Sequence, residues 1–285
     1  MSNEEQGIML QRSFRSSSEA AEHWQQDVER RRQDFADATQ RMLEAAGLGL
    51  GDHVLDIGAG TGDQSLLAAR KVGPDGFILA TDLSAEMLKI AAQVAQQEGL
   101  TTITTRVMNA EQLDLEDDAF DAVISRLALM LIENRKQALR EIRRVLKPGG
   151  KLAALVWSVP ENNPLFALPL AIVSKYAKGA ASHSPHPLSL SDPTVLEREL
   201  TEANFSQVNT CTLAFQSHYA SLDAFMDSTA SRLTAGVMEH LILQKQQQLL
   251  EEMKQALIQF EGPHGFVAPA EMLLGVGCKE IRMYR

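Results

Sequence analysis

A short apolar run that leads into a glycine-rich turn constrains the fold of this chain more than any other feature. Residues 54–57 read Val-Leu-Asp-Ile, and residues 58–62 read Gly-Ala-Gly-Thr-Gly. A helical pattern follows, with Leu66, Leu67 and Ala69 as its apolar positions. Glycine lets a backbone approach a ligand closely because it has no Cβ, and a helix that begins at such a turn offers N–H groups without helical partners. The sequence therefore predicts a strand, a ligand-binding turn and a helix.

Strands and helices continue to alternate along the chain. Apolar or β-branched runs predict further strands at 77–81, 103–107, 120–125, 151–157, 207–215 and 272–278, and helical patterns cover 84–94, 133–146 and 194–203. This rhythm predicts parallel βαβ units, that is, an α/β fold with helices on both faces of an open twisted sheet. In such sheets the ligand binds at the carboxyl ends of the strands. Residues 18–46, 160–187 and 221–260 hold further helical patterns, and we interpret the last two as insertions that cap a substrate.

Composition and charge argue against several classes of partner. The formal net charge is −10, whereas a nucleic-acid-binding protein usually presents a basic face. The two cysteines, Cys211 and Cys278, lack metal-binding spacing, and a Pro-rich loop around His183 and His186 lacks the helix that would aim both rings at a metal. No apolar run is long enough to span a bilayer, and the first residues show no signal sequence. We expect a cytoplasmic protein without a metal, nucleic-acid or membrane partner.

The glycine turn also indicates the chemistry of its ligand. A dinucleotide fingerprint needs a glycine at position 63, where this chain has Asp63. A carboxylate is a poor neighbour for a pyrophosphate but is harmless beside S-adenosylmethionine (SAM), which carries a sulfonium cation and no phosphate. Asp56 is placed to receive the ammonium group of such a ligand, directly or through water, and Gly58, Ala59 and Gly60 would form the loop around it. A turn that merely connects two elements is the alternative.

Polar residues after the next two strands are placed to hold a nucleoside. Asp82 ends the second strand and can accept hydrogen bonds from both ribose hydroxyls, although it can equally cap the following helix. Asn109 follows the third strand, where a polar side chain can bond the adenine amino group. The remaining predicted contacts are Leu83 and Met87, as apolar faces for the ring, with Ala110, Glu111 and Ser125.

From residue 54 to residue 157 the sequence resembles the class I SAM-dependent methyltransferases, in particular the ubiquinone/menaquinone-biosynthesis type and its small-molecule relatives. The stretches that carry the resemblance are 56–62, Asp82, 109–111, 120–123 and 146–152. The family often has aspartate where this chain has Asn109, whose amide oxygen can also accept an adenine N–H bond. The resemblance implies a Rossmann-like seven-stranded sheet with helices on both faces, an antiparallel last strand at 272–278, and an added helical cap.

The resemblance also implies a division of roles along the chain. Residues 1–48, with Trp24, would be an N-terminal helical segment that closes over the cofactor. Residues 49–158 would be the SAM-binding core. Residues 159–285 would complete the sheet and carry the helical insertions, at about 160–187 and 221–260, that select the substrate.

The expected reaction is methyl transfer to O, N or C of a small, partly apolar metabolite. The end of the fourth strand lacks the Asp/Asn-Pro-Pro-aromatic motif of amino-methylating DNA enzymes, the Pro-Cys pair of cytosine C5 enzymes and the acidic magnesium site of catechol-type enzymes. A metal-independent enzyme that works mainly by proximity and orientation remains. His218 is a candidate base, and Trp24, Asn163 and Tyr219 are candidate substrate contacts. An NAD(P)-dependent oxidoreductase and a non-catalytic SAM-binding protein remain as alternatives.

Overall fold

The structure, a computed structural model, describes residues 28–176 and 186–281, which form two compact units. Residues 35–158, 186–213 and 272–281 form the first, which we call the sheet unit. Residues 28–34, 159–176 and 214–271 form the second, which we call the helical unit. Among the described residues, no helix combines the length and the apolar character that a membrane crossing requires.

The strands form one sheet in the order β3-β2-β1-β4-β5-β8-β6. They are β1 (His53–Ile57), β2 (Phe77–Asp82), β3 (Ile103–Val107), β4 (Phe120–Arg126), β5 (Leu146–Trp157), β6 (Ser206–Tyr219) and β8 (Gly265–Cys278), and the two-residue β7 (Glu261–Gly262) pairs with β8. The first five strands pair in parallel, and β8 runs antiparallel to β5. The predicted α/β sheet with an antiparallel last strand is confirmed, with β7 as a short addition.

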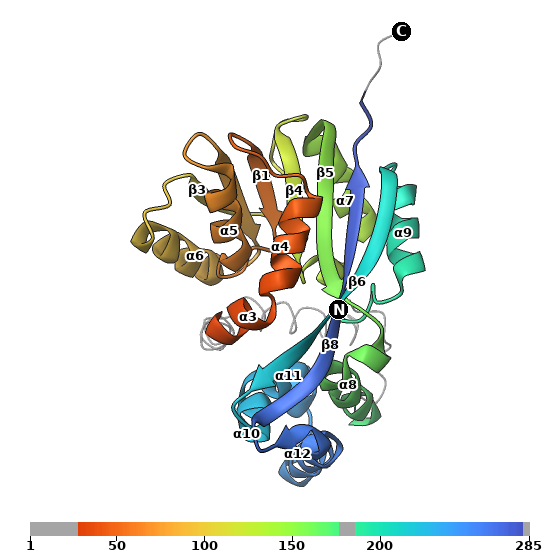
Figure 1. Cartoon of the computed structure of the whole chain (residues 1–285). Coiled ribbons are helices and arrows are strands. Elements are labelled where there is room, and N and C mark those ends of the chain that lie inside the picture. The colour runs from red at the N-terminus through yellow and green to blue at the C-terminus, as the bar shows by residue number, and fades with distance from the viewer. Residues whose placement is uncertain (1–27, 177–185, 282–285) are drawn as a thin grey trace. The chain divides into compact units, whose positions relative to one another are not determined.

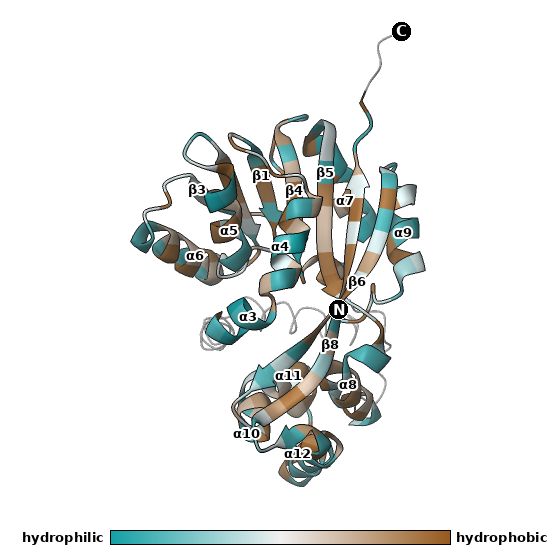
Figure 2. Ribbon diagram, viewed as in Figure 1, coloured by the Kyte–Doolittle hydropathy of each residue, from teal (hydrophilic) through white to brown (hydrophobic). Residues whose placement is uncertain are grey.

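Helices cover both faces of the sheet unit because each has one apolar side. They are α4 (Ala36–Ala45), α5 (Asp63–Val72), α6 (Ala85–Gln97), α7 (Arg135–Val145) and α9 (Pro193–Glu202), with a 3-10 helix at Leu129–Leu131. Figure 1 shows α4 and α5 in front of the sheet and α7 behind it. In α7 the buried residues Ala138, Leu139, Ile142 and Val145 recur at helical spacing. Figure 2 shows the matching concentration of hydrophobic residues on the central strands.

Side-chain caps set where several of these helices begin. The hydroxyl of Ser84 accepts a hydrogen bond from the amide of Met87 at 3.3 Å and starts α6. Asn134 accepts from the amide of Gln137 at 3.2 Å and starts α7. Each cap satisfies one of the N–H groups that a helix leaves without a partner in its first turn.

Residues 148–150, which lie between the predicted helix at 133–146 and the predicted strand at 151–157, form a bulge inside β5. The pairing of β4 with β5 shifts register there, because Phe120 pairs with Leu146 while Ala122 pairs with Lys151. Pro148 has no N–H to give to a ladder, and Gly149 adopts a φ of 87°. The chain therefore bulges and continues the same strand rather than reversing.

Strands β6 and β8 extend beyond their predicted bounds into the helical unit. In that unit they accompany α3 (Val28–Asp34), α8 (Pro164–Tyr176), α10 (Leu222–Phe225), a π-helix at Met226–Ala230, α11 (Ser231–Met238), α12 (Leu243–Leu257) and 3-10 turns at Pro160–Asn162 and Ile258–Phe260. Phe225, Leu249, Met253 and Phe266 are fully buried in its core. The sequence does not predict these strand extensions, because the apolar residues in them pack against the core of the helical unit, which only the structure reveals. That these helices cap a substrate stays a prediction.

Candidate functional site

The loop after β1 lies where the order of the parallel strands reverses. From β1 the chain proceeds to β2 and β3 on one side, whereas β4 and β5 lie on the other. In open α/β sheets this switch point is where ligands bind, beyond the carboxyl ends of the strands. The residues predicted to bind the cofactor lie at or just after the carboxyl ends of β1, β2, β3 and β4, so the topology gathers them at this edge of the sheet unit.

The glycines of this loop are required by its conformation and by close packing. Gly58, Gly60 and Gly62 have φ angles of 69°, 56° and 86°, in the left-handed region. A Cβ built on Gly58 would lie 2.2 Å from the Cβ of Ala128, and one on Gly62 would lie 2.8 Å from the Cβ of Ala91. The loop therefore packs against its neighbours with no room for side chains at these two positions.

Asp56 anchors the glycine loop to the helix that follows it. Its carboxylate is fully buried and accepts hydrogen bonds from the Gln64 amide, at 3.1 Å, and from the Ser65 hydroxyl. Burial raises the pKa of Asp56 to about 6, and the hydrogen bonds from Ser65 and Gln64 act in the opposite direction. The structure gives Asp56 a role in loop geometry, and its contact with a ligand ammonium group stays a prediction.

Asp82 joins the loop after β1 to the loop after β2. One carboxylate oxygen accepts the amide of Gly60 at 2.9 Å, and the other accepts the amide of Ser84 at 2.9 Å. Burial raises the pKa of this carboxyl although the amides favour its ionised form. A carboxylate has about four acceptor positions, so Asp82 keeps capacity for a further donor, as a ribose hydroxyl would supply. The next residue, Leu83, exposes 58% of its surface beside it.

The loop after β3 is tied to the same edge. The amide of Met108 donates to the carbonyl of Asp82 at 3.0 Å, which brings the neighbouring Asn109 to this region. The side-chain oxygen of Asn109 accepts the amide of Glu111 at 3.0 Å. Asn109 is exposed, and Ala110 and Glu111 are half-buried. The structure thus brings the predicted ribose and adenine residues together, while their contacts with a cofactor stay predictions.

Ser125 and Arg126 end β4, and both are buried. Ser125 is fully buried and donates to the carbonyl of Ile57 at 3.1 Å, which fastens β4 to β1. Arg126 lies 3.3 Å from Asp63 in an ion pair whose side chains are 6% and 2% exposed. No sequence pattern indicates this pair, because its members are 63 positions apart. Since Arg126 balances Asp63, the charge of Asp63 does not by itself exclude a pyrophosphate.

One buried polar atom in the loop lacks a partner. The hydroxyl oxygen of Thr61 is buried, and no described residue forms a hydrogen bond with it. Such an atom costs free energy until a polar group satisfies it. This set of residues fits SAM. It comprises a glycine loop without space for Cβ atoms, the available acceptor positions of Asp82, the exposed Leu83 and the buried hydroxyl of Thr61.

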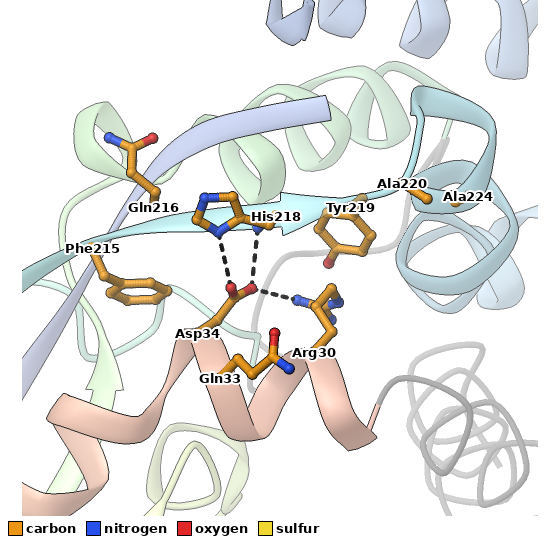
Figure 3. Close-up of a pocket in the computed structure, with 9 residues that line it drawn as sticks. All are labelled: Arg30, Gln33, Asp34, Phe215, Gln216, His218, Tyr219, Ala220 and Ala224. Carbon is orange, nitrogen blue, oxygen red and sulfur yellow. Dashed lines mark hydrogen bonds and ion pairs between the residues drawn. The ribbon is translucent and has the colours of Figure 1, made fainter. Parts of the chain in front are cut away.

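The candidate substrate residues that the structure describes, Asn163, His218 and Tyr219, belong to the helical unit. A pocket of about 770 Å³ is lined by Arg30, Gln33, Asp34, Phe215, Gln216, His218, Tyr219, Ala220 and Ala224. Figure 3 shows two of the predicted residues, His218 and Tyr219, side by side in this pocket. Asn163 is 1% exposed, and its amide bonds the backbone of Glu271 in both directions, at 3.0 Å each. Its geometry gives no support to a substrate contact, which stays a prediction. Trp24 and His183 lie outside the described residues.

Comparisons with known proteins identify relatives of this chain. A family model described as a methyltransferase domain matches residues 49–184. The chain is 37% identical over 124 residues to the ubiquinone/menaquinone biosynthesis C-methyltransferase UbiE of Pseudomonas aeruginosa, a match that covers 43% of this chain and 48% of that protein. It is 31% identical over 179 residues to UbiE of Pasteurella multocida, covering 59% of this chain and 67% of that protein. This chain thus spans about half to two thirds of the length of these curated relatives.

The fold is shared with a solved structure as well. The crystal structure of the YcgJ protein from Bacillus subtilis superposes with a TM-score of 0.61 at 20% identity, over 87% of this chain and 100% of that one. At this identity the likeness concerns the fold, and the sequence matches establish the relationship. The chain belongs to the class I SAM-dependent methyltransferases.

Proposed function

We propose that this protein transfers a methyl group from SAM to O, N or C of a small, partly apolar acceptor, without a metal. The observation that carries the proposal is the arrangement of Asp82, which holds the amides of Gly60 and Ser84 and keeps acceptor positions for a ribose. It stands beside a loop in which Gly58 has no room for a side chain. Family membership supports the same function.

Different residues would bind the ribose, the adenine ring and the amino acid end of SAM. Asp82 would accept the ribose hydroxyls, Leu83 and Met87 would contact the adenine ring, and Asn109 would bond its amino group. Ala59, Gly60 and Thr61 would lie along the amino acid end. SAM brings an already activated methyl group, so the protein contributes mainly alignment of the acceptor with it.

The relatives add one reaction to the assays. They are named C-methyltransferases of ubiquinone and menaquinone biosynthesis, so carbon methylation of a small organic acceptor is assayed beside methylation of oxygen and nitrogen. We propose that the helical unit binds the acceptor, because its pocket has room for a small molecule. We place the protein in the cytoplasm, which the thiol state of Cys211 and Cys278 supports.

Isothermal titration with S-adenosylhomocysteine tests the cofactor site. Replacing Asp82 with alanine removes a charged acceptor from two backbone amides and from the ribose. A hydrogen bond to a charged group contributes about 1.5–3 kcal/mol, so we expect binding roughly 10- to 100-fold weaker. Asp75→Ala is the matched control, because Asp75 is exposed in the turn before β2, and we expect unchanged affinity.

Three outcomes decide between the functions considered. Failure of the folded wild-type protein to bind S-adenosylhomocysteine would reject the proposal, and tight binding of NADH in its place would support an oxidoreductase. Binding followed by transfer of labelled methyl groups to a small-molecule extract supports a methyltransferase. Binding without transfer to any component of extracts from several sources would indicate a non-catalytic SAM-binding protein.

A further inference from the structure

An aspartate and a histidine form a pair in the pocket of the helical unit. Asp34 ends α3, and His218 lies near the end of β6. The Nδ1 atom of His218 lies 3.1 Å from Oδ1 of Asp34, and the backbone amide of His218 donates to Oδ2 at 3.2 Å (Figure 3). Two contacts to one carboxylate therefore fix the histidine, although the residues are 184 positions apart.

The two side chains differ sharply in exposure. The Asp34 side chain is 4% exposed, whereas that of His218 is 58% exposed. Asp34 is held by further donors, with Nη1 of Arg30 at 3.1 Å and the hydroxyl of Ser217 at 3.3 Å. An ordinary surface ion pair exposes both partners and is worth little. Here a buried carboxylate with its own anchors orients an exposed imidazole.

This arrangement selects one tautomer of the neutral histidine. An ionised carboxylate only accepts hydrogen bonds, so the proton on the neutral ring must sit on Nδ1 of His218. Nε2 is then an unprotonated acceptor. Figure 3 shows this second nitrogen turned away from Asp34, and no described residue forms a hydrogen bond with it. The charged groups close to the ring are Asp34 and, through the same carboxylate, Arg30.

The pocket around the histidine offers both apolar and polar walls. Phe215, Ala220 and Ala224 supply apolar surface, and Gln33 and Gln216 supply amides. This lining suits a small molecule with an apolar body and one polar group near the imidazole. A cavity of about 770 Å³ is ample for such a molecule.

We propose that His218 accepts the proton that the methyl acceptor loses and that Asp34 is its positioning residue, an inference that rests on the proposed methyltransferase function. The acceptor class is a neutral molecule with an apolar body whose hydroxyl group is still protonated at neutral pH. Its O–H bond breaks, and the proton goes to Nε2 of His218, where Asp34 stabilises the imidazolium. The electron pair left on the acceptor forms the bond to the methyl carbon, and the pair of the broken carbon–sulfur bond stays on sulfur. His218 then releases its proton to water.

Nitrogen NMR of ¹⁵N-histidine-labelled full-length protein, saturated with S-adenosylhomocysteine, tests the pair. We expect neutral His218 to carry its proton on Nδ1, with its signals assigned from His218→Gln. In Asp34→Asn the donors at the Oδ2 position retain the amide oxygen, which turns the NH₂ group toward the ring. We therefore expect this variant to reverse the tautomer and place the proton on Nε2. His240→Gln, which removes an exposed histidine outside the pocket, should leave the His218 signals unchanged.

Phenol and anisole serve as matched probes of proton acceptance. Phenol should shift the Nε2 resonance of wild-type His218, and anisole, which has no hydroxyl proton, should not. Asp34→Asn should lose the phenol shift while it binds S-adenosylhomocysteine as the wild type does. A wild-type proton on Nε2, an unchanged tautomer in Asp34→Asn, or equal shifts from the two probes would each overturn the assignment of His218. Loss of S-adenosylhomocysteine binding by the wild type would instead refute the proposed function.

Discussion

Replacing Gly58 with alanine tests whether close packing fixes the cofactor loop. The added Cβ would lie 2.2 Å from the Cβ of Ala128, whereas carbon atoms in contact lie about 3.5–4.0 Å apart. The loop or its neighbour must therefore move by roughly 1.5 Å. Gly99 is a matched control, because it also has a φ of 69° but nothing lies within 4 Å of the position that its Cβ would take.

The magnitude follows from separating the two costs. A left-handed conformation costs an alanine about 1–2 kcal/mol, and both variants bear this cost. Overpacking adds about 1–3 kcal/mol at Gly58 alone. We expect Gly99→Ala to lower the free energy of unfolding by about 1–2 kcal/mol and Gly58→Ala by about 2–5 kcal/mol. Because the loop must also shift, Gly58→Ala should weaken S-adenosylhomocysteine binding, and Gly99→Ala should not.

A double-mutant cycle isolates the contact. Without the Cβ of Ala128, the closest remaining atom to the new methyl group is the Cα of that residue, at 3.7 Å, which is ordinary contact. Urea unfolding followed by circular dichroism should therefore show that Ala128→Gly restores about 1–3 kcal/mol to Gly58→Ala beyond the sum of the single effects. Equal costs for the two glycine variants, or a coupling energy near zero, would refute the packing argument.

The remaining predictions concern the buried charges of the sheet unit. Burial raises the pKa of Asp56 to about 6, so the folded state binds the proton of this carboxyl more tightly than the unfolded state does. The resulting contribution to stability is complete below about pH 4 and is lost as the pH rises to about 6. Relative to Asp56→Asn, the wild type should thus lose about 2–3 kcal/mol between pH 4 and pH 7 in urea titrations, and a constant difference would contradict the burial of the carboxyl. Arg126→Met removes an ion-pair partner of buried Asp63 and should destabilise by about 3 kcal/mol in the same assay. Adding Asp63→Asn should recover part of that loss, and additive effects would count against the pair.

Local patterns were sufficient to predict much of the candidate cofactor site. The turn from β1 into α5 depends on a few consecutive residues, and the glycines that it needs stand in the sequence at 58, 60 and 62. Asp82 was likewise predictable, since the last residue of a parallel strand comes to the same edge as the loop after the neighbouring strand. The structure added that its carboxylate already holds Gly60 and Ser84.

Contacts between distant segments were not predictable in the same way. No local pattern indicates that Arg126 reaches Asp63, or that Ala128 leaves no space for a side chain at Gly58. The sequence indicates His218 as a candidate, but it does not indicate Asp34, because Asp34 resembles the other acidic residues on a polar helix face. Only the packing of α3 beside β6 reveals it as the histidine's partner.

The sequence by itself determined the alternation of strands and helices, the glycine turn and the membership of the family, because each of these depends on periodicity or on residues that are neighbours in the chain. The tertiary structure alone decided how far β6 and β8 extend, which carboxylates are buried, and which side chain each one holds. The physical reason is that burial and pairing depend on which segments pack together, and sheet register brings together residues that the chain keeps far apart.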